Sequence, residues 1–215
     1  MPTFLSLSTP EPGNSAPLLA HLLDNRAGTA LSGPLHGAPV LLASRLTAGA
    51  EAVVELDIDP QALPPHAAVR YDLHPANAEL PGALSVKLPD SRTVFLRPGR
   101  GWVQRLQSVL AAGHDAGLPA EVSQPEVADF LAVLAHAEVG FVARADDGAG
   151  VVRVLCATVA ALRGDDVRSA WQRPQLSGLK AVPAPAARAL REVLRSVEVP
   201  DAASVQAELA AMGLP

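Results

Sequence analysis

Short runs of alternating apolar and polar residues, separated by prolines, fill the stretch from residue 54 to residue 96. Around 54–58, 69–74 and 84–88, every second residue is apolar and the residues between them are charged or polar. A period of two is the repeat of a β-strand, whose successive side chains point to opposite faces of a sheet. Five prolines between residues 60 and 81 exclude a long helix there. The pattern predicts an antiparallel sheet with one face on the core and the other in water.

The residues between two of these runs have the chemistry of a tight turn. Pro89, Asp90 and Ser91 follow the run 84–88 and precede 92–97, so the two runs are predicted to pair as a hairpin. We therefore assign residues 15–98 to a small antiparallel β-rich unit. Residues 1–14, rich in Pro, Ser and Thr, are predicted to form a flexible arm.

The second half of the chain has helical periodicity. Apolar residues recur at intervals of three and four over 102–112, 124–138, 185–197 and 202–212. Ser123 and Glu126 form a capping box before the second of these segments, and Asp201 caps the last. Residues 99–215 are therefore predicted to form a mainly helical unit, joined to the β-rich unit at Trp102, and the fold class is α+β.

A winged-helix-like part is predicted at 101–156. The helix 124–138 runs directly into 140–155, which has two apolar runs around Asp146, Asp147 and Gly148 and is typical of a hairpin. In a winged helix, this helix would face DNA and the hairpin would be the wing. Its polar positions and the wing tip are mainly acidic, so contact with protein is favoured over contact with phosphate.

Composition limits the function further. The 215 residues are 49% hydrophobic and 3% aromatic, with a net charge of −5 and a single cysteine, Cys156. The charge argues against a general nucleic-acid coat protein, and one cysteine excludes an internal disulfide or a four-cysteine zinc site. Many Ala, Pro, Gly and Arg residues with only two lysines are typical of a GC-rich bacterial genome.

Two groups of arginines are candidates for binding nucleic acid or another anion. The first surrounds a glycine-containing turn and the second lies along the predicted helix 185–197, in a region where basic residues outnumber acidic ones. Their members are Arg92, Arg97, Arg100 and Arg105 in the first group, and Arg188, Arg191 and Arg195 in the second.

No recognised motif identifies a catalytic or metal site. Asp72 and His74 share one side of a predicted strand and could begin a metal site with His36 as a third ligand, but their spacing matches no known ligand pattern. We therefore predict no metal, no cofactor and no catalytic residue from motifs.

The function expected from these observations is a non-enzymatic binding or adaptor protein that acts through protein–protein contacts. One alternative is a nucleic-acid-binding or regulatory protein that uses the arginines. A second alternative is an enzyme with an unrecognised site, near Arg97, Arg100 and the histidines of the β-rich unit. The expected partner is an unidentified protein or a second copy of the chain, and the N-terminal sequence predicts a cytoplasmic protein without a membrane partner.

Overall fold

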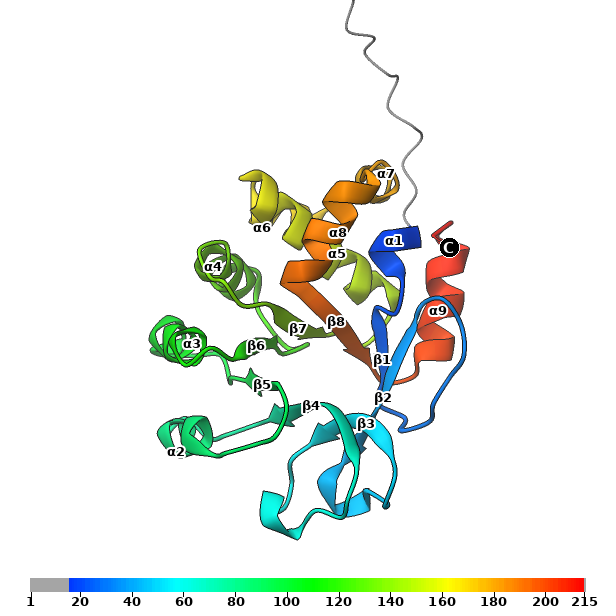
Figure 1. Ribbon diagram of the computed structural model, residues 1–215. Helices are drawn as coiled ribbons and strands as arrows, with labels where there is room; N and C mark the ends of the chain where they lie inside the picture. Colours follow the sequence, from blue (N-terminus) through cyan, green and yellow to red (C-terminus); the bar gives the residue numbers. More distant parts are fainter. Residues whose placement is uncertain (1–15, 215) are drawn as a thin grey trace, which may run out of the picture.

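Eight parallel strands form one closed barrel. The computed structural model describes residues 16–214, and each strand pairs in parallel with the next along the chain until β8 pairs with β1 (Figure 1). The strands are β1 (Leu23–Asn25), β2 (His36–Leu42), β3 (Glu51–Glu55), β4 (Ala67–Leu73), β5 (Arg92–Phe95), β6 (Asp115–Leu118), β7 (Phe141–Arg144) and β8 (Leu194–Val199).

Helices surround the barrel unevenly. From β5 to β8 they flank the strands, whereas the connections around β2, β3 and β4 are mainly loops and single turns (Figure 1). The helices are α1 (Ala16–Leu19), α2 (Leu80–Ser85), α3 (Trp102–Ala111), α4 (Gln124–Leu134), α5 (Gly148–Arg163), α6 (Val167–Gln172), α7 (Leu176–Lys180), α8 (Ala184–Val193) and α9 (Ala202–Ala211), with 3-10 turns η1 (Ala43–Arg45) and η2 (Pro60–Ala62). The arrangement resembles a (β/α)₈ barrel with a reduced helical layer on one side.

The predicted fold, an antiparallel β-rich unit followed by a helical unit, is wrong. Residues 84–88 are not a strand: α2 covers 80–85 and returns the chain so that β5 runs parallel to β4. Alternation of apolar and polar residues indicates that a segment is extended, but it does not indicate whether neighbouring strands run parallel or antiparallel. Strands on both sides of residue 98 belong to the same barrel, while the predicted arm 1–14 lies outside the described residues.

The winged-helix-like part predicted at 101–156 is also wrong. That range contains α3, β6, α4 and β7 in turn, and the second half of the expected hairpin is the start of α5. The supposed wing tip is a helix cap, because the Asp147 side chain accepts a hydrogen bond from the Gly150 N–H at 2.6 Å. An Asp-Gly sequence is common to hairpin turns and to helix starts, and the long apolar run after it here is helical.

Helix prediction was more successful where a cap accompanied the apolar period. The structure confirms helices within 102–112, 124–138 and 202–212. The Glu126 side chain accepts from the Ser123 N–H at 2.8 Å, and Asp201 accepts from the N–H of Ala203. The predicted helix 185–197 ends at Val193, where β8 begins.

Most apolar side chains lie between the strands and the helices. Trp102, Phe130 and Phe141 pack against each other in this outer core, with ring centroids 6.0 and 5.4 Å apart. A smaller cluster around Tyr71 and Val54 covers the outside of β3 and β4. The apolar residues of the alternating runs therefore face outward, toward loops and helices.

The polar residues of β4 point into the barrel rather than into water. Arg70 and Asp72 are buried and meet side chains from β1 and β8, whereas Tyr71 and Leu73 between them join the outer cluster. The predicted alternation of this strand is correct, but the predicted wet face is the barrel interior.

Gly117 on β6 also faces the interior, where a Cβ atom would collide with ring atoms of Phe95. We expect Gly117→Ala to lower the free energy of unfolding by roughly 1–3 kcal/mol, because the ring must leave its packed position. Urea denaturation measures the change. The control is Gly82→Ala in α2, where an added Cβ meets nothing, and where alanine favours the helix by about 0.5–1 kcal/mol. Equal effects of the two substitutions would contradict the predicted collision.

Candidate functional site at the carboxyl end of the barrel

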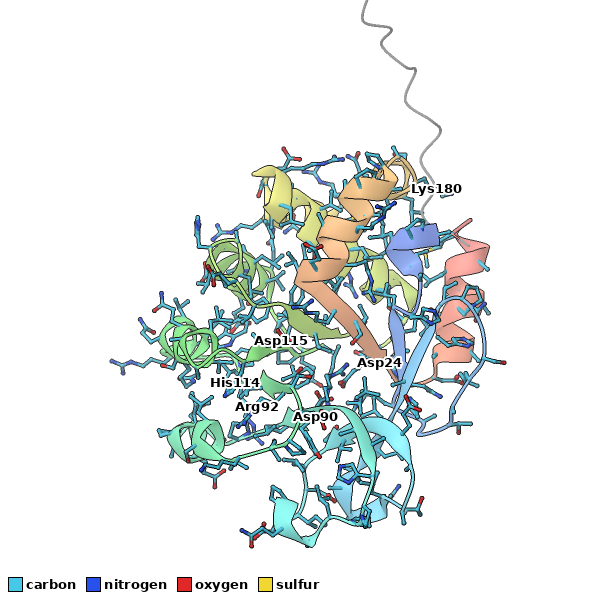
Figure 2. All side chains as sticks on the ribbon, viewed as in Figure 1. Asp24, Asp90, Arg92, His114, Asp115 and Lys180 are labelled. Carbon is cyan, nitrogen blue, oxygen red and sulfur yellow. The ribbon has the colours of Figure 1, made fainter. Side chains whose placement is uncertain are left out.

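A buried arginine connects three strands of the barrel through its hydrogen bonds. The Arg70 guanidinium, on β4, donates to Asp24 of β1 at 2.7 Å, to Asp72 of its own strand at 2.9 Å and to Glu198 of β8 at 2.6 Å. It also donates to the Ser196 hydroxyl at 2.9 Å. Asp24, on β1, is labelled in Figure 2. We call Arg70, Asp24, Asp72, Ser196 and Glu198 the Arg70 layer.

The pKa values of two carboxyl groups in this layer are shifted in opposite directions. Burial raises the pKa of Asp72 well above its usual value, and the neighbouring charge of Glu198 raises it further against the opposing effect of Arg70. Burial alone would also raise the pKa of Glu198, but the hydrogen bond with Asp72 and the charges of Arg70 and Arg144 lower it to about 2. The layer therefore favours a proton on Asp72 over a proton on Glu198.

Arg144, the last residue of β7, crosses the carboxyl end of the barrel above this layer. Its guanidinium donates to Glu198 at 2.8 Å and to Glu55, the last residue of β3, at 2.9 Å. The same group lies 4.3 Å from the ring centroid of Phe95 at the end of β5. Arg144 thus connects the Arg70 layer with residues that solvent can reach.

His74 completes this end of the barrel. Its ring stacks on Phe95 with centroids 4.8 Å apart, and its Nε2 lies 3.0 Å from an Arg144 nitrogen. Burial, together with the charge of Arg144, lowers the pKa of His74 to about 4. The imidazole is therefore neutral at pH 7, and because Nε2 accepts from Arg144, its proton is assigned to Nδ1.

Arg26, directly after β1, is the most exposed member of the site. Its guanidinium lies 3.9 Å from Glu55 and 4.0 Å from Glu198, and its side chain is 39% exposed. Apart from the buried Asp72, and with His74 neutral, the charged groups of the interior and its mouth balance: three arginines face three carboxylates. The arginines are Arg26, Arg70 and Arg144, and the carboxylates are Asp24, Glu55 and Glu198.

Two pockets open at this end, one on each side of the Glu55–Arg144 ion pair. The β1–β3 pocket has a volume of about 290 Å³, and Arg26, Arg45 and Glu55 are its charged lining residues. The β4–β7 pocket has a volume of about 390 Å³ and contains His74, Phe95, Arg97, Glu121 and Arg144. Volumes of this size fit small molecules rather than polymers.

The predicted arginines of the first group divide between the two ends of the barrel. Arg97 lines the β4–β7 pocket together with His74, two residues named for the enzyme alternative. Arg105 on α3 donates to the backbone carbonyls of Arg100 at 2.7 Å and Arg97 at 3.1 Å, so its guanidinium organises the loop after β5. Arg92 lies at the amino end of β5, near His114 and Asp115 in Figure 2, and donates to the Val86 carbonyl.

The second group lies at the amino end, away from both pockets. Arg191 donates to the Leu194 carbonyl at 2.8 Å, Arg195 lies 3.7 Å from Asp115, and Arg188 is exposed on α8. The seven arginines therefore do not form one continuous surface. Nucleic-acid binding by either group stays a prediction.

Sequence reasoning missed the residues that contribute most to the site. Arg26, Glu55, Arg144 and Glu198 come from four strands or strand ends and match no spacing motif. One feature of the sequence could have identified two of them: Glu55 and Arg144 are charged residues that each end an apolar run. Asp72 and His74 were considered for a metal, but no group of three metal-binding side chains occurs within residues 16–214.

Cys156 lies elsewhere, in a separate hollow of about 520 Å³ between α5, α6 and α7. The side chain is buried, and burial raises the pKa of its thiol. Little thiolate is present at neutral pH, so this cysteine is a weak nucleophile.

Among the described residues, no helix has the length and apolar character needed to cross a membrane. Comparison of the chain with protein-family models, with curated proteins and with solved structures found no match. Any functional conclusion therefore depends on the chemistry of the barrel end.

Replacing Arg70 tests the importance of the buried layer. We expect Arg70→Met to lower the free energy of unfolding by about 3–5 kcal/mol, because buried carboxylates lose their counter-charge. Arg195→Met is the control: its 3.7 Å ion pair is exposed, and we expect a loss of about 1 kcal/mol or less. Chemical denaturation at pH 7 measures both. A loss for Arg70→Met no larger than that of the control would show that the layer contributes little to stability.

His74 should make stability depend on pH. Its pKa is about 4 in the folded chain and 6.5 in the unfolded one, so its stabilisation is complete above pH 6.5 and decreases as the pH falls toward 4. The unfolding free energy of wild type should therefore fall relative to that of His74→Gln by on the order of 2 kcal/mol across this window. His136→Gln, at an exposed histidine, should follow wild type. If the unfolding free energies of wild type and His74→Gln change with pH in the same way, His74 is not a buried neutral imidazole with a lowered pKa.

Proposed function

We propose that this chain is an enzyme that transfers a proton at a carbon next to a carbonyl group of a small anionic substrate. The observation that carries the proposal is the meeting of Glu55, His74 and Arg144 at the carboxyl end of the barrel, beside two pockets. These groups supply a base, a neutral hydrogen-bond donor and a fixed positive charge in one place.

Glu55 is the proposed base. Its carboxylate is 20% exposed and lines the β1–β3 pocket, so a substrate can reach it. Glu55 takes the proton from carbon, and the electron pair of the broken C–H bond moves onto the carbonyl oxygen. Return of the proton to the opposite face of the same carbon gives an isomer. Where that carbon carries a hydroxyl group, transfer of the hydroxyl proton to the former carbonyl oxygen also allows the carbon-bound proton to return to the former carbonyl carbon. The reaction therefore needs no oxidant, reductant or second substrate.

The negative charge that develops on the carbonyl oxygen needs hydrogen-bond donors already in position. Arg144 is held by Glu198, Glu55 and the Phe95 ring, and therefore needs little rearrangement when that charge appears. His74 is neutral and can donate from Nδ1 without bringing a second positive charge next to Arg144. Arg26 lies 3.9 Å from the same Glu55 oxygen that accepts from Arg144.

The position of the site supports the proposal by analogy only. Enzymes built on parallel eight-stranded barrels have their active sites at the carboxyl ends of the strands, but one fold serves many reactions. The residues, rather than the fold, favour acid–base chemistry. An adaptor function and a nucleic-acid-binding function, both predicted from the sequence, remain predictions: the arginines that suggested the latter are dispersed over two ends of the barrel.

Proton exchange with solvent tests the proposal directly. Wild type is incubated in D₂O with a panel of 2-oxo acids, 2-hydroxy acids, and aldose and ketose phosphates. Proton NMR follows the C–H signal next to each carbonyl or carboxylate. We expect loss of that signal with at least one compound, and a rate roughly 10²–10⁴-fold lower with Glu55→Gln.

Glu192→Gln is the matched control, because this exposed carboxylate lies on α8 away from both pockets. It should exchange protons at the wild-type rate, and thermal melting checks that Glu55→Gln is folded. No exchange with any compound, or equal rates in wild type and Glu55→Gln, would overturn the proposed function.

A further inference from the structure

The two pockets of the barrel end have the same charge pattern. Each contains two arginines and one carboxylate: Arg26 and Arg45 with Glu55 in the β1–β3 pocket, and Arg97 and Arg144 with Glu121 in the β4–β7 pocket. In each pocket, one arginine belongs to the charge-balanced interior and the other comes from a loop beyond a strand end. The loop arginines are Arg45, in η1 after β2, and Arg97, after β5.

Neither loop arginine is neutralised by a close ion pair. Within residues 16–214, neither Arg45 nor Arg97 has a carboxylate within 4 Å. Asp57 is the acidic group whose pKa Arg45 influences, but hydrogen bonds from Ser44 are the main cause of its lowered pKa. Because Arg26 and Arg144 already balance Glu55 and Glu198, Arg45 adds positive charge to the edge of the β1–β3 pocket, while in the β4–β7 pocket Arg97 and Glu121 line the same space without a close ion pair between them.

The pockets are separated by a single ion pair. Glu55 lines one pocket and accepts a hydrogen bond at 2.9 Å from Arg144, which lines the other. Arg26, in the first pocket, lies 3.9 Å from the same Glu55 carboxylate. A small molecule that crosses this ion pair would place its middle carbons beside Glu55 and its two ends in the two pockets.

We infer that the substrate carries two separate anionic groups, such as carboxylates or phosphates, with one group bound in each pocket and the reacting carbon between them. The inference rests on the proposed function, because it places the reacting carbon at Glu55. Arg45 and Arg97 bind the two ends and hold no reacting atom. They therefore set which molecules bind, while Glu55, His74 and Arg144 act on the carbon.

Binding measurements with matched probes test the inference. Isothermal titration calorimetry compares 3-phosphoglycerate and dicarboxylates of four to six carbons with glycerol 3-phosphate and butyrate, which carry one anionic group. We call a probe with two anionic groups two-ended and a probe with one anionic group one-ended. We expect at least one two-ended probe to bind wild type roughly 10- to 100-fold more tightly than the one-ended probes. Arg45→Gln and Arg97→Gln should each reduce the affinity for that probe to the level of a one-ended probe.

Arg188→Gln removes the same charge from the exposed surface of α8 and should leave the affinity unchanged. All three positions are exposed, and thermal melting checks that each variant is folded. The inference is overturned if no two-ended probe binds, if one-ended probes bind equally well, or if Arg45→Gln and Arg97→Gln behave like Arg188→Gln.

Different outcomes would exclude the proton-transfer function and the substrate with two anionic groups. Glu55-dependent proton exchange on compounds with one anionic group, without tighter binding of any two-ended probe, would leave the proposed function and remove the two-ended substrate. Arginine-dependent binding of a two-ended probe, without exchange on any compound, would leave the two-ended site and remove the proton-transfer function.

Discussion

The ion pairs of Arg70 determine how the barrel is filled. Small parallel barrels usually pack their interior with branched apolar side chains, but here a guanidinium meets carboxylates from β1, β4 and β8 at 2.6 to 2.9 Å. Charges removed from water are tolerated only when they are paired and fully hydrogen-bonded. A one-residue shift of β4 would turn Arg70 and Asp72 outward and remove the arginine partner of Asp24 and one of the arginine partners of Glu198, so the layer also fixes the register of that strand.

The same layer positions the groups at the barrel end. Glu198 accepts from Arg70 with one carboxylate oxygen and from Arg144 with the other. Arg144 in turn contacts Glu55, His74 and the Phe95 ring. The position of the exposed residues therefore depends on a buried one through a continuous series of charge-assisted hydrogen bonds, which is how a rigid supporting layer keeps a site in place.

The sequence predicts some features of this structure because they are local. Caps at Ser123 and Asp201 and the apolar period after them identify α4 and α9, and alternation correctly separates Arg70 and Asp72 from Tyr71 and Leu73. Which of these rows faces the interior depends on partners 46 and 128 residues away. Strand direction depends on the connections, and the turn-like residues 89–91 suit a loop before a parallel strand as well as a hairpin. The site could not be predicted for the same reason, since Glu55 and Arg144 meet only after closure of the barrel.

The pairing of arginines with carboxyl groups inside the barrel affects which anions can bind at its carboxyl end. Burial and the charge of Glu198 favour the protonated form of Asp72, the neutral His74 adds no positive charge, and each of Arg26, Arg70 and Arg144 has a carboxylate partner. The interior arginines are consequently fully matched by carboxylates, and they attract an external anion only weakly. Arg45 and Arg97 lie outside this balance, on loops at the pocket edges. The net charge of the whole chain is −5, so anions are attracted locally by these two arginines rather than by the overall field of the protein.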